Sequence, residues 1–311
     1  MLAALLLLAC TEGEHPLDDV LSLNDAQVVG THNSYHIETA ALQAWAYTHR
    51  PLDEQMVDLG VRQFELDLNW VDDRWEVFHI PVLDEGTTCR AFDDCLQALL
   101  TGSETLGPHL PVLVLLEIKQ VHDENAADRL RALNTSLTSV LGPEHLVTPG
   151  DLGGTTADVA AGMSAGWPVL EGQRGAFIPV IHDDGDWAAT AREVQPDALF
   201  LDGFGDLAAP WAAYHSMNNP DDPRIAEVVS AGHLVRTRAD SDTEEARAGD
   251  TSRRDAALAS GATFISTDFP SPHPETGYVV EIPGGEPAGC SPVGAPSSCE
   301  ALALEDPALL E

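Results

Sequence analysis

The sequence predicts an α/β fold, a closed (β/α)8 barrel of the TIM type, and two patterns support that prediction. Short apolar runs that resemble strands alternate with helical patterns along most of the 311 residues, which is typical of a parallel sheet with helical crossovers. About eight strands within roughly 270 residues fit a closed barrel better than an open doubly wound sheet. No G-x-G-x-x-G motif follows the first strand, which weakens a dinucleotide-binding alternative.

The expected strands are short and apolar, and they cover residues 27–31, 63–68, 112–118, 176–181, 198–201, 233–237 and 263–267. The expected helices lie between them, at residues 53–59, 91–100, 125–140, 187–194, 225–231 and 253–260. Several of these helices end at a glycine, namely Gly60, Gly142, Gly232 and Gly261. Glycine readily takes the left-handed conformation that stops a helix, so these positions support the assigned helix ends.

Three parts are expected along the chain. Residues 1–24 resemble a signal, lipobox and tether, residues 25–282 form the barrel, and residues 283–311 form an irregular extension rich in Gly, Pro and Ser. The apolar run 2–9 is too short to span a bilayer but long enough for a signal-peptide core. It leads into Cys10, as in the lipobox of bacterial lipoproteins, although no Lys or Arg precedes it.

We therefore expect an exported protein without a transmembrane helix. Its anchor would be a lipidated Cys10 on the periplasmic or cell-surface side of a membrane, and a secreted form is the other possibility. An apolar tail with an incidental cysteine is the alternative interpretation of this segment.

The remaining four cysteines form two closely spaced pairs, which makes Cys89–Cys95 and Cys290–Cys299 the natural choice among three possible pairings. Two local disulfides are consistent with an oxidising compartment. Neither pair is accompanied by the further cysteines or histidines of a zinc site.

The charge of the chain excludes several classes of partner. It has 15 Lys and Arg against 51 Asp and Glu, a formal net charge of −36. A nucleic-acid-binding protein needs a basic face for phosphates, and a polybasic membrane-surface protein needs one for anionic lipids. Neither class fits, and the sequence indicates no protein partner. Lys119 is the only lysine in the chain.

Polar residues stand at the ends of three expected strands, the place where barrel enzymes carry their sites. Glu65 and Asp67 are two residues apart and share one face of their strand, as do Glu117 and Lys119. Carboxylates that point into a barrel are costly unless they are paired or bound to a cation. With Asn33 at the end of the first strand, the set favours a hard, oxygen-binding ion, and calcium tolerates such an irregular set better than magnesium.

Two histidines reach the same rim. His32 follows the first strand, and His79 follows an apolar stretch after Asp67. Histidines beside a divalent ion form an acid–base pair suited to phosphoryl or acyl chemistry. A lone histidine at a strand end is more often structural, so the prediction depends on the combination.

These residues resemble the calcium-dependent phosphatidylinositol-specific phospholipase C family, in its compact bacterial single-barrel type. The resemblance lies in the motif at 30–35, the Glu65-x-Asp67 pair, His79 and Glu117, and it continues through 86–96, 235–240 and 260–270. It implies a catalytic Ca²⁺ held by Asn33, Glu65, Asp67 and Glu117, with His32 and His79 as catalytic histidines. It also implies cleavage between glycerol and phosphate of an inositol phospholipid at a membrane surface.

The expected reaction uses an inositol hydroxyl as the nucleophile and yields diacylglycerol and a cyclic or hydrolysed inositol phosphate. Glu65 or Glu117 would take the proton and His79 would serve as general acid, although the two histidines could exchange roles. Lys119, Arg236 and Arg238 would contact the substrate anion; a buried ion pair is the alternative for Lys119. Two other functions stay open. One is a glycerophosphodiester phosphodiesterase or sphingomyelinase D-like barrel, and the other is an inactive calcium-binding lipoprotein.

Overall fold

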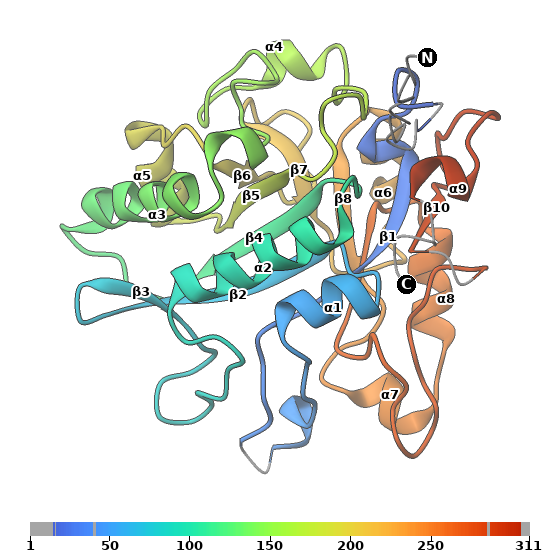
Figure 1. Ribbon diagram of the computed structural model, residues 1–311, viewed down its shortest axis with the longest axis horizontal. Coiled ribbons are helices and arrows are strands. Elements are labelled where there is room, and N and C mark those ends of the chain that lie inside the picture. The colour runs from blue at the N-terminus through green and yellow to red at the C-terminus, as the bar shows by residue number, and fades with distance from the viewer. Residues whose placement is uncertain (1–14, 16, 40–41, 285–286, 306–311) are drawn as a thin grey trace, which may run out of the picture.

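A closed barrel of parallel strands forms the centre of the molecule (Figure 1). The computed structural model describes residues 15, 17–39, 42–284 and 287–305. Cys10 lies outside the described residues. Within them, eight parallel strands make up the barrel: β1 (Ala26–Thr31), β2 (Gln63–Val71), β4 (Val112–Ile118), β5 (Phe177–His182), β6 (Phe200–Asp202), β7 (Ala212–Ser216), β8 (Leu234–Arg238) and β9 (Phe264–Thr267). The predicted TIM-type barrel is therefore confirmed.

Closure of the barrel involves the C-terminal segment as well. On one edge β1 pairs with β9 in parallel, and near its end Gly30 pairs with Gln63 of β2. The start of β1 pairs instead with the short antiparallel strand β10 (Ala288–Cys290). Because β10 and β2 lie at different heights along β1, the segment after the barrel covers a stretch of β1 that β2 leaves unpaired.

The sequence analysis missed one barrel strand, β7. Its residues are Ala-Ala-Tyr-His-Ser, and alanine has a low strand propensity while the polar pair gives no apolar run. The strand forms because it pairs with β6 and β8 on either side. The hairpin strand β3 (Arg74–Val77), antiparallel to β2, was also not predicted.

Helices surround the barrel. The six expected ones are α1 (Leu52–Asp58), α2 (Phe92–Leu106), α3 (Ala126–Val140), α5 (Asp186–Val194), α6 (Arg224–Ser230) and α8 (Ser252–Ala259). The short helices α4 (Ala160–Met163), α7 (Glu244–Ala248) and α9 (Ala301–Leu304) were not expected, nor were the 3₁₀ turns Leu23–Asp25, Gln43–Trp45 and Pro143–His145. Within the described residues, no helix has the length and apolar character needed to cross a bilayer.

Strand alternation separates the core from the site. On β2, Phe64, Leu66 and Leu68 face outward and pack in one apolar cluster with residues of α2 and α3. The alternate positions, including Glu65 and Asp67, therefore point into the barrel. Apolar side chains fill the barrel below them, so the polar groups gather at the end where the strands terminate.

The C-terminal segment is fastened at the opposite end of the barrel. Both predicted disulfides are present: Cys89–Cys95 joins the loop before α2 to its first turn, and Cys290–Cys299 joins the end of β10 to the loop before α9. Beyond the second disulfide, the buried carboxylate of Glu305 accepts a hydrogen bond of 2.9 Å from Nε of the buried Arg62. This ion pair ties the segment after α9 to the residue that precedes β2.

Candidate active site

The predicted metal ligands converge at the carboxyl ends of β1, β2 and β4. Register places Asp67 opposite Glu117 on neighbouring strands. One oxygen from each of Glu65, Asp67 and Glu117 lies within 4.8 Å of the others. Asn33 follows β1 in the left-handed conformation at φ 42°, which asparagine tolerates better than most residues.

Backbone contacts fix Asn33 beside this group. Ser34 N–H donates to the Glu65 carbonyl at 2.9 Å, and Ser34 Oγ accepts from Glu65 N–H at 2.8 Å. These paired bonds join the loop after β1 to the middle of β2. The residue before Ser34 is therefore held at the same height as the carboxylates.

Three acceptor oxygens of this cluster lack donors among the described residues. Among the described residues, no hydrogen bond reaches the buried oxygens Asn33 Oδ1, Asp67 Oδ1 and Asp67 Oδ2. Lys119 Nζ lies 3.2 Å from Asp67 Oδ2 without hydrogen-bond geometry, and it donates to Glu117 Oε1 at 2.5 Å. Buried acceptors without partners are costly, and hard oxygen donors of this kind suit Ca²⁺. The residues present thus fit a calcium ion.

Neighbouring cations compensate the negative charge of Glu65 more fully than that of Asp67. Burial raises the pKa of Asp67, and the nearby Glu117 carboxylate raises it further. Burial would also raise the pKa of Glu65, but Arg236 and other cations outweigh it and lower this pKa to about 2. Arg236 Nη2 lies 2.6 Å from Glu65 Oε2 inside the barrel. Asp67 is therefore the carboxylate that would gain most from a bound cation.

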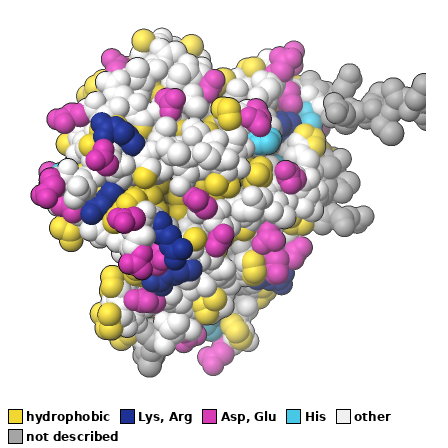
Figure 2. Space-filling view, turned by 60° about the vertical axis from the view of Figure 1, so that its left-hand side comes forward, with side chains coloured by type: hydrophobic (Ala, Val, Ile, Leu, Met, Phe, Trp, Pro, Cys, Tyr) yellow, Lys and Arg dark blue, Asp and Glu magenta, His cyan; other side chains and the backbone are white. Residues whose placement is uncertain are grey.

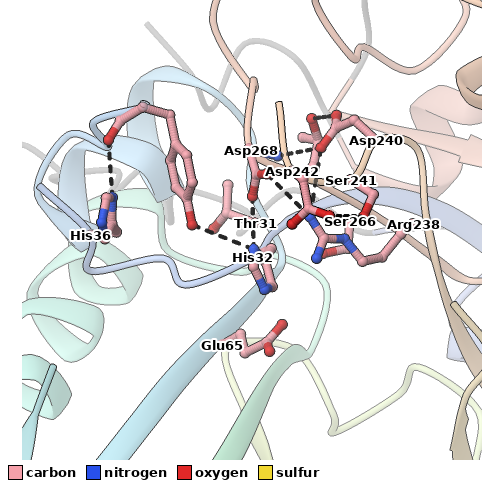
Figure 3. Close-up of polar contacts among 12 residues, drawn as sticks. Thr31, His32, His36, Glu65, Arg238, Asp240, Ser241, Asp242, Ser266 and Asp268 are labelled. Atoms are coloured by element: carbon pink, nitrogen blue, oxygen red, sulfur yellow. Dashed lines mark hydrogen bonds and ion pairs between the residues drawn. The ribbon is translucent and has the colours of Figure 1, made fainter. Parts of the chain in front are cut away.

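The side chain of His32 is oriented by Asp268, which directly follows β9, the last strand of the barrel. Its Nδ1 lies 2.8 Å from Asp268 Oδ1, and Asp268 Oδ2 accepts from Arg238 Nη2 at 3.1 Å. Figure 3 shows the His32 ring between Asp268 and Glu65. Burial opposes ionisation of Asp268, but Arg238 and His32 lower its pKa to about 2. An ionised Asp268 accepts the Nδ1 proton, which leaves Nε2 as the free nitrogen of His32.

His79 has a similar arrangement with a different aspartate. Its Nδ1 lies 2.9 Å from Oδ2 of the buried Asp84, which also lies 2.9 Å from His36 Nε2. Thr39 Oγ1 donates to Asp84 Oδ1 at 3.0 Å. Burial lowers the pKa of His79 although the Asp84 hydrogen bond opposes the shift. Each predicted catalytic histidine thus has a buried carboxylate partner.

The other predicted cations are engaged in ion pairs. Lys119 contacts two carboxylates of the cluster, Arg236 contacts Glu65, and Arg238 contacts Asp268. The structure therefore brings all the residues predicted for chemistry to one rim. The three cations are held by carboxylates, which fixes their positions at the edge of the site.

The sequence analysis assigned no role to several residues of this rim. Asp84 and Asp268 were among them, and so was His182 at the end of β5, whose Nδ1 lies 2.8 Å from Asp202 Oδ2. Burial alone would lower the pKa of His182, but Asp202 outweighs it and raises the value. The rule that polar strand ends mark the site would have found His182, because it directly follows the apolar run of β5.

Surface charge outside the site is dispersed. Figure 2 shows acidic side chains scattered over the visible face among basic and hydrophobic ones. On this face the acidic side chains form no single patch, whereas the candidate site is a local grouping of carboxylates, histidines and cations.

Comparisons with known proteins agree with this geometry. The family model for Ca²⁺-dependent phosphoinositide phospholipase C matches residues 21–74 and 72–292. No curated protein matches the chain significantly.

Solved structures of similar fold include a calcium-dependent phosphoinositol-specific phospholipase C from Pseudomonas sp, 18% identical, with 88% of this chain and 97% of the other covered and a TM-score of 0.63. The Streptomyces antibioticus enzyme is 19% identical, with 80% and 95% covered and a TM-score of 0.55. The Listeria monocytogenes phosphatidylinositol-specific phospholipase C is 14% identical, with 81% and 91% covered and a TM-score of 0.51. At these identities the structural matches support the barrel fold.

Proposed function

This chain belongs to the Ca²⁺-dependent phosphoinositide phospholipase C family, a family of phosphodiesterases, and from that premise we propose that it cleaves the glycerol–phosphate bond of phosphatidylinositol-type lipids. The observation that carries the proposal is the convergence of Asp67, whose buried oxygens receive no hydrogen bond, with Glu65 and Glu117. Asn33, whose buried Oδ1 also lacks a donor, lies on the loop that Ser34 joins to Glu65. They lie on the same rim as two aspartate-oriented histidines.

Asn33, Glu65, Asp67 and Glu117 would hold the calcium ion. When bound there, Ca²⁺ lowers the pKa of the attacking hydroxyl and offsets negative charge on the phosphoryl oxygens. Lys119 and Arg236 neutralise part of the negative charge of the same carboxylates. Their ion pairs keep the ligand oxygens directed toward the common centre.

His32 is the better proton acceptor of the groups at hand. The ion pair with Arg236 lowers the pKa of Glu65 to about 2, so this carboxylate is a weak base. The hydrogen bond from Nδ1 to Asp268 leaves His32 Nε2 free to accept the proton of the inositol hydroxyl. We therefore propose that His32, in place of Glu65 or Glu117, takes this proton, and keep both carboxylates as metal ligands; Glu117 accepts a hydrogen bond from Lys119.

His79 serves as the general acid. The hydroxyl oxygen forms a new bond to phosphorus while the bond from phosphorus to the glycerol oxygen breaks, and His79 delivers its proton to that leaving oxygen. Its lowered pKa makes the imidazolium a stronger acid. The products are diacylglycerol and a cyclic inositol phosphate, which water can open when the two histidines act in the reverse sense.

Turnover of phosphatidylinositol by histidine variants tests the assignment. Loss of general acid or base help typically reduces the rate by about 10²–10⁴-fold, so we expect that loss for His32→Ala and His79→Ala. His145→Ala is the matched control, because His145 lies outside the site and its Nδ1 bonds only to the backbone of Leu141. A rate within threefold of the parent for either site variant would contradict the assignment.

Metal dependence gives an independent check. Chelation should abolish turnover, and Ca²⁺ should restore it much better than Mg²⁺, because the cluster offers an irregular set of oxygen ligands. Full activity in excess chelator would refute the role of calcium.

A further inference from the structure

Asp240 is a fully buried aspartate that joins three segments at the carboxyl end of the barrel. It lies two residues after β8. Its Oδ1 accepts a hydrogen bond from Asp268 N–H at 2.9 Å, and its Oδ2 accepts one from Tyr278 Oη–H at 3.2 Å and another from Thr267 Oγ1–H. Thr267 ends β9, and Tyr278 lies between β9 and β10. The carboxylate thus fixes the backbone of Asp268, the residue that orients His32.

Asp240 and Asp268 share one arginine. Arg238 Nη2 lies 3.1 Å from Asp268 Oδ2 and 3.9 Å from Asp240 Oδ1. The side chain of Arg238 is 11% exposed, and those of the two aspartates are 0–1% exposed. Figure 3 shows the three side chains grouped beside His32. One guanidinium therefore faces two buried carboxylates, which carry one negative charge in excess when both are ionised.

The hydrogen bonds of Asp240 do not by themselves require a charge. Tyr278 Oη–H has a second acceptor, the Ala239 carbonyl, at 3.0 Å, so the phenol oxygen is able to accept from an amide N–H. Thr267 Oγ1 accepts from Phe269 N–H at 2.8 Å and has a second lone pair. An asparagine would therefore find a partner for each polar atom, and a buried carboxylate is costlier than a buried amide. Hydrogen bonding explains a polar side chain at this position, and the charge needs another reason.

The surroundings of Asp240 determine when this charge is present. The charged and titratable groups around it are Arg238 on β8, Asp268 after β9 and Tyr278, with Glu245 of α7 and Arg254 of α8 next to Tyr278, and with His32, His49 and Tyr47 next to Asp268. Burial and the Asp268 carboxylate raise the pKa of Asp240 to about 7, although Arg238 opposes the shift. The pKa of Asp268 is lowered to about 2. Asp268 is thus ionised throughout the neutral range, whereas Asp240 gains its charge as the pH rises through 7.

We propose that Asp240 is a positioning residue for the reaction, whose negative charge acts through Asp268 and their shared Arg238 to stabilise the positive charge on His32 when His32 takes the proton of the attacking hydroxyl. Asp268 Oδ1 contacts His32 Nδ1 at 2.8 Å, while Arg238 neutralises the same carboxylate from its other oxygen. Asp240 engages part of the Arg238 charge, which leaves Asp268 more negative toward His32. This inference rests on the proposed function, because it needs His32 as the proton acceptor.

The pH dependence of turnover in Asp240→Asn tests the role of the charge. Phosphatidylinositol turnover is measured in Ca²⁺ from pH 5.5 to pH 8. At pH 8 the variant should have kcat lowered about tenfold with KM within twofold of the parent, because a charge is removed from a buried network that acts on the proton acceptor. At pH 5.5 the two proteins should agree within about twofold, because Asp240 is then neutral in the parent as well.

Asp25→Asn is the matched control. Asp25 is also a buried aspartate, 9% exposed, but it lies directly before β1 at the opposite end of the barrel, where its Oδ2 accepts from Ser22 N–H at 2.9 Å. This variant should keep the parent rate at every pH. Thermal unfolding at pH 8 accompanies the kinetics, and Asp240→Asn should melt at or above the temperature of the parent, since a buried charge is replaced by an amide.

Three results for Asp240→Asn would overturn the proposal. One is kcat within twofold of the parent at pH 8, and another is a loss of equal size at pH 5.5 and pH 8, which a merely structural role would give. The third is a variant that fails to fold or melts well below the parent, because the carboxylate would then be needed for the fold. A parent that does not turn over phosphatidylinositol would refute the proposed function and this role with it, whereas a fully active Asp240→Asn variant would refute this role alone.

Discussion

Replacing Asp67 with asparagine should change calcium-free and calcium-bound stability in opposite directions. Asp67 is buried, and its two oxygens receive no hydrogen bond from the described residues. Burial and the Glu117 carboxylate raise its pKa although Lys119 Nζ lies 3.2 Å away and opposes the shift. Without calcium, the carboxylate is a destabilising group in the folded protein. With calcium, the same group is a ligand.

The expected size follows from the cost of such a group. Lys119 compensates only part of the cost of this buried carboxylate and also pairs with Glu117, so removing the Asp67 charge should stabilise the calcium-free protein by about 1–3 kcal/mol, which corresponds to roughly 2–6 °C in a chain of this size. Calcium at 100 times its dissociation constant should stabilise the parent by about 2.7 kcal/mol. The Asp67→Asn variant should lose most of that increment, so the order of the two melting temperatures reverses when calcium is added.

Thermal unfolding at pH 8 measures both effects, in excess chelator and in excess Ca²⁺. Glu193→Gln is the control for the many surface acids, because Glu193 is exposed on α5. Its calcium increment should equal that of the parent. The reasoning is refuted when Asp67→Asn is less stable than the parent in chelator, or when it keeps the full calcium increment.

Three further predictions concern groups around the site and the barrel. Asp268→Asn should lower kcat about 10–10²-fold without weakening calcium binding, since His32 loses the acceptor that fixes its tautomer; steady-state kinetics and calcium titration check this. Glu305→Gln should cost about 3–5 kcal/mol in urea unfolding, because Arg62 is left buried without its counter-charge. Burial lowers the pKa of His109 to about 4. As the pH falls from 6.5 to 4, His109 is protonated in the unfolded chain but stays neutral in the folded protein. The free energy of unfolding should therefore fall by about 3 kcal/mol between pH 6.5 and pH 4. NMR should show no titration of His109 above pH 5, and a midpoint near 6.5 would contradict the argument.

Most of the barrel could be predicted because strand and helix periods are local properties of the sequence. The exception among the barrel strands, β7, contains two alanines and a polar pair. Its strand conformation comes from pairing with β6 and β8, and such tertiary pairing leaves no period in the sequence.

The metal cluster was predictable for a related reason. Alternation within β2 and β4 places Glu65, Asp67 and Glu117 on inward faces, and parallel register brings the strand ends together. The partners of the histidines were not predictable in this way. Asp268 is 236 residues from His32, and Asp84 reaches His79 and His36 through a turn whose conformation depends on several hydrogen bonds.

The C-terminal segment illustrates the same limit. Its Gly, Pro and Ser content predicts irregular structure, and the disulfide follows from cysteine spacing. Nothing local indicates that β10 pairs with the start of β1, or that Glu305 binds Arg62 across 243 residues. Both contacts join segments that are distant in the sequence and lie side by side only in the folded barrel.

Phosphorus NMR of the products from phosphatidylinositol, with Ca²⁺ and with excess chelator, tests the central claim most directly. The account predicts the phosphorus signal of a cyclic inositol phosphate, which grows as the signal of the lipid falls in Ca²⁺ and is absent in chelator. Phosphatidate with free inositol as the product, or equal product formation in chelator, would contradict it.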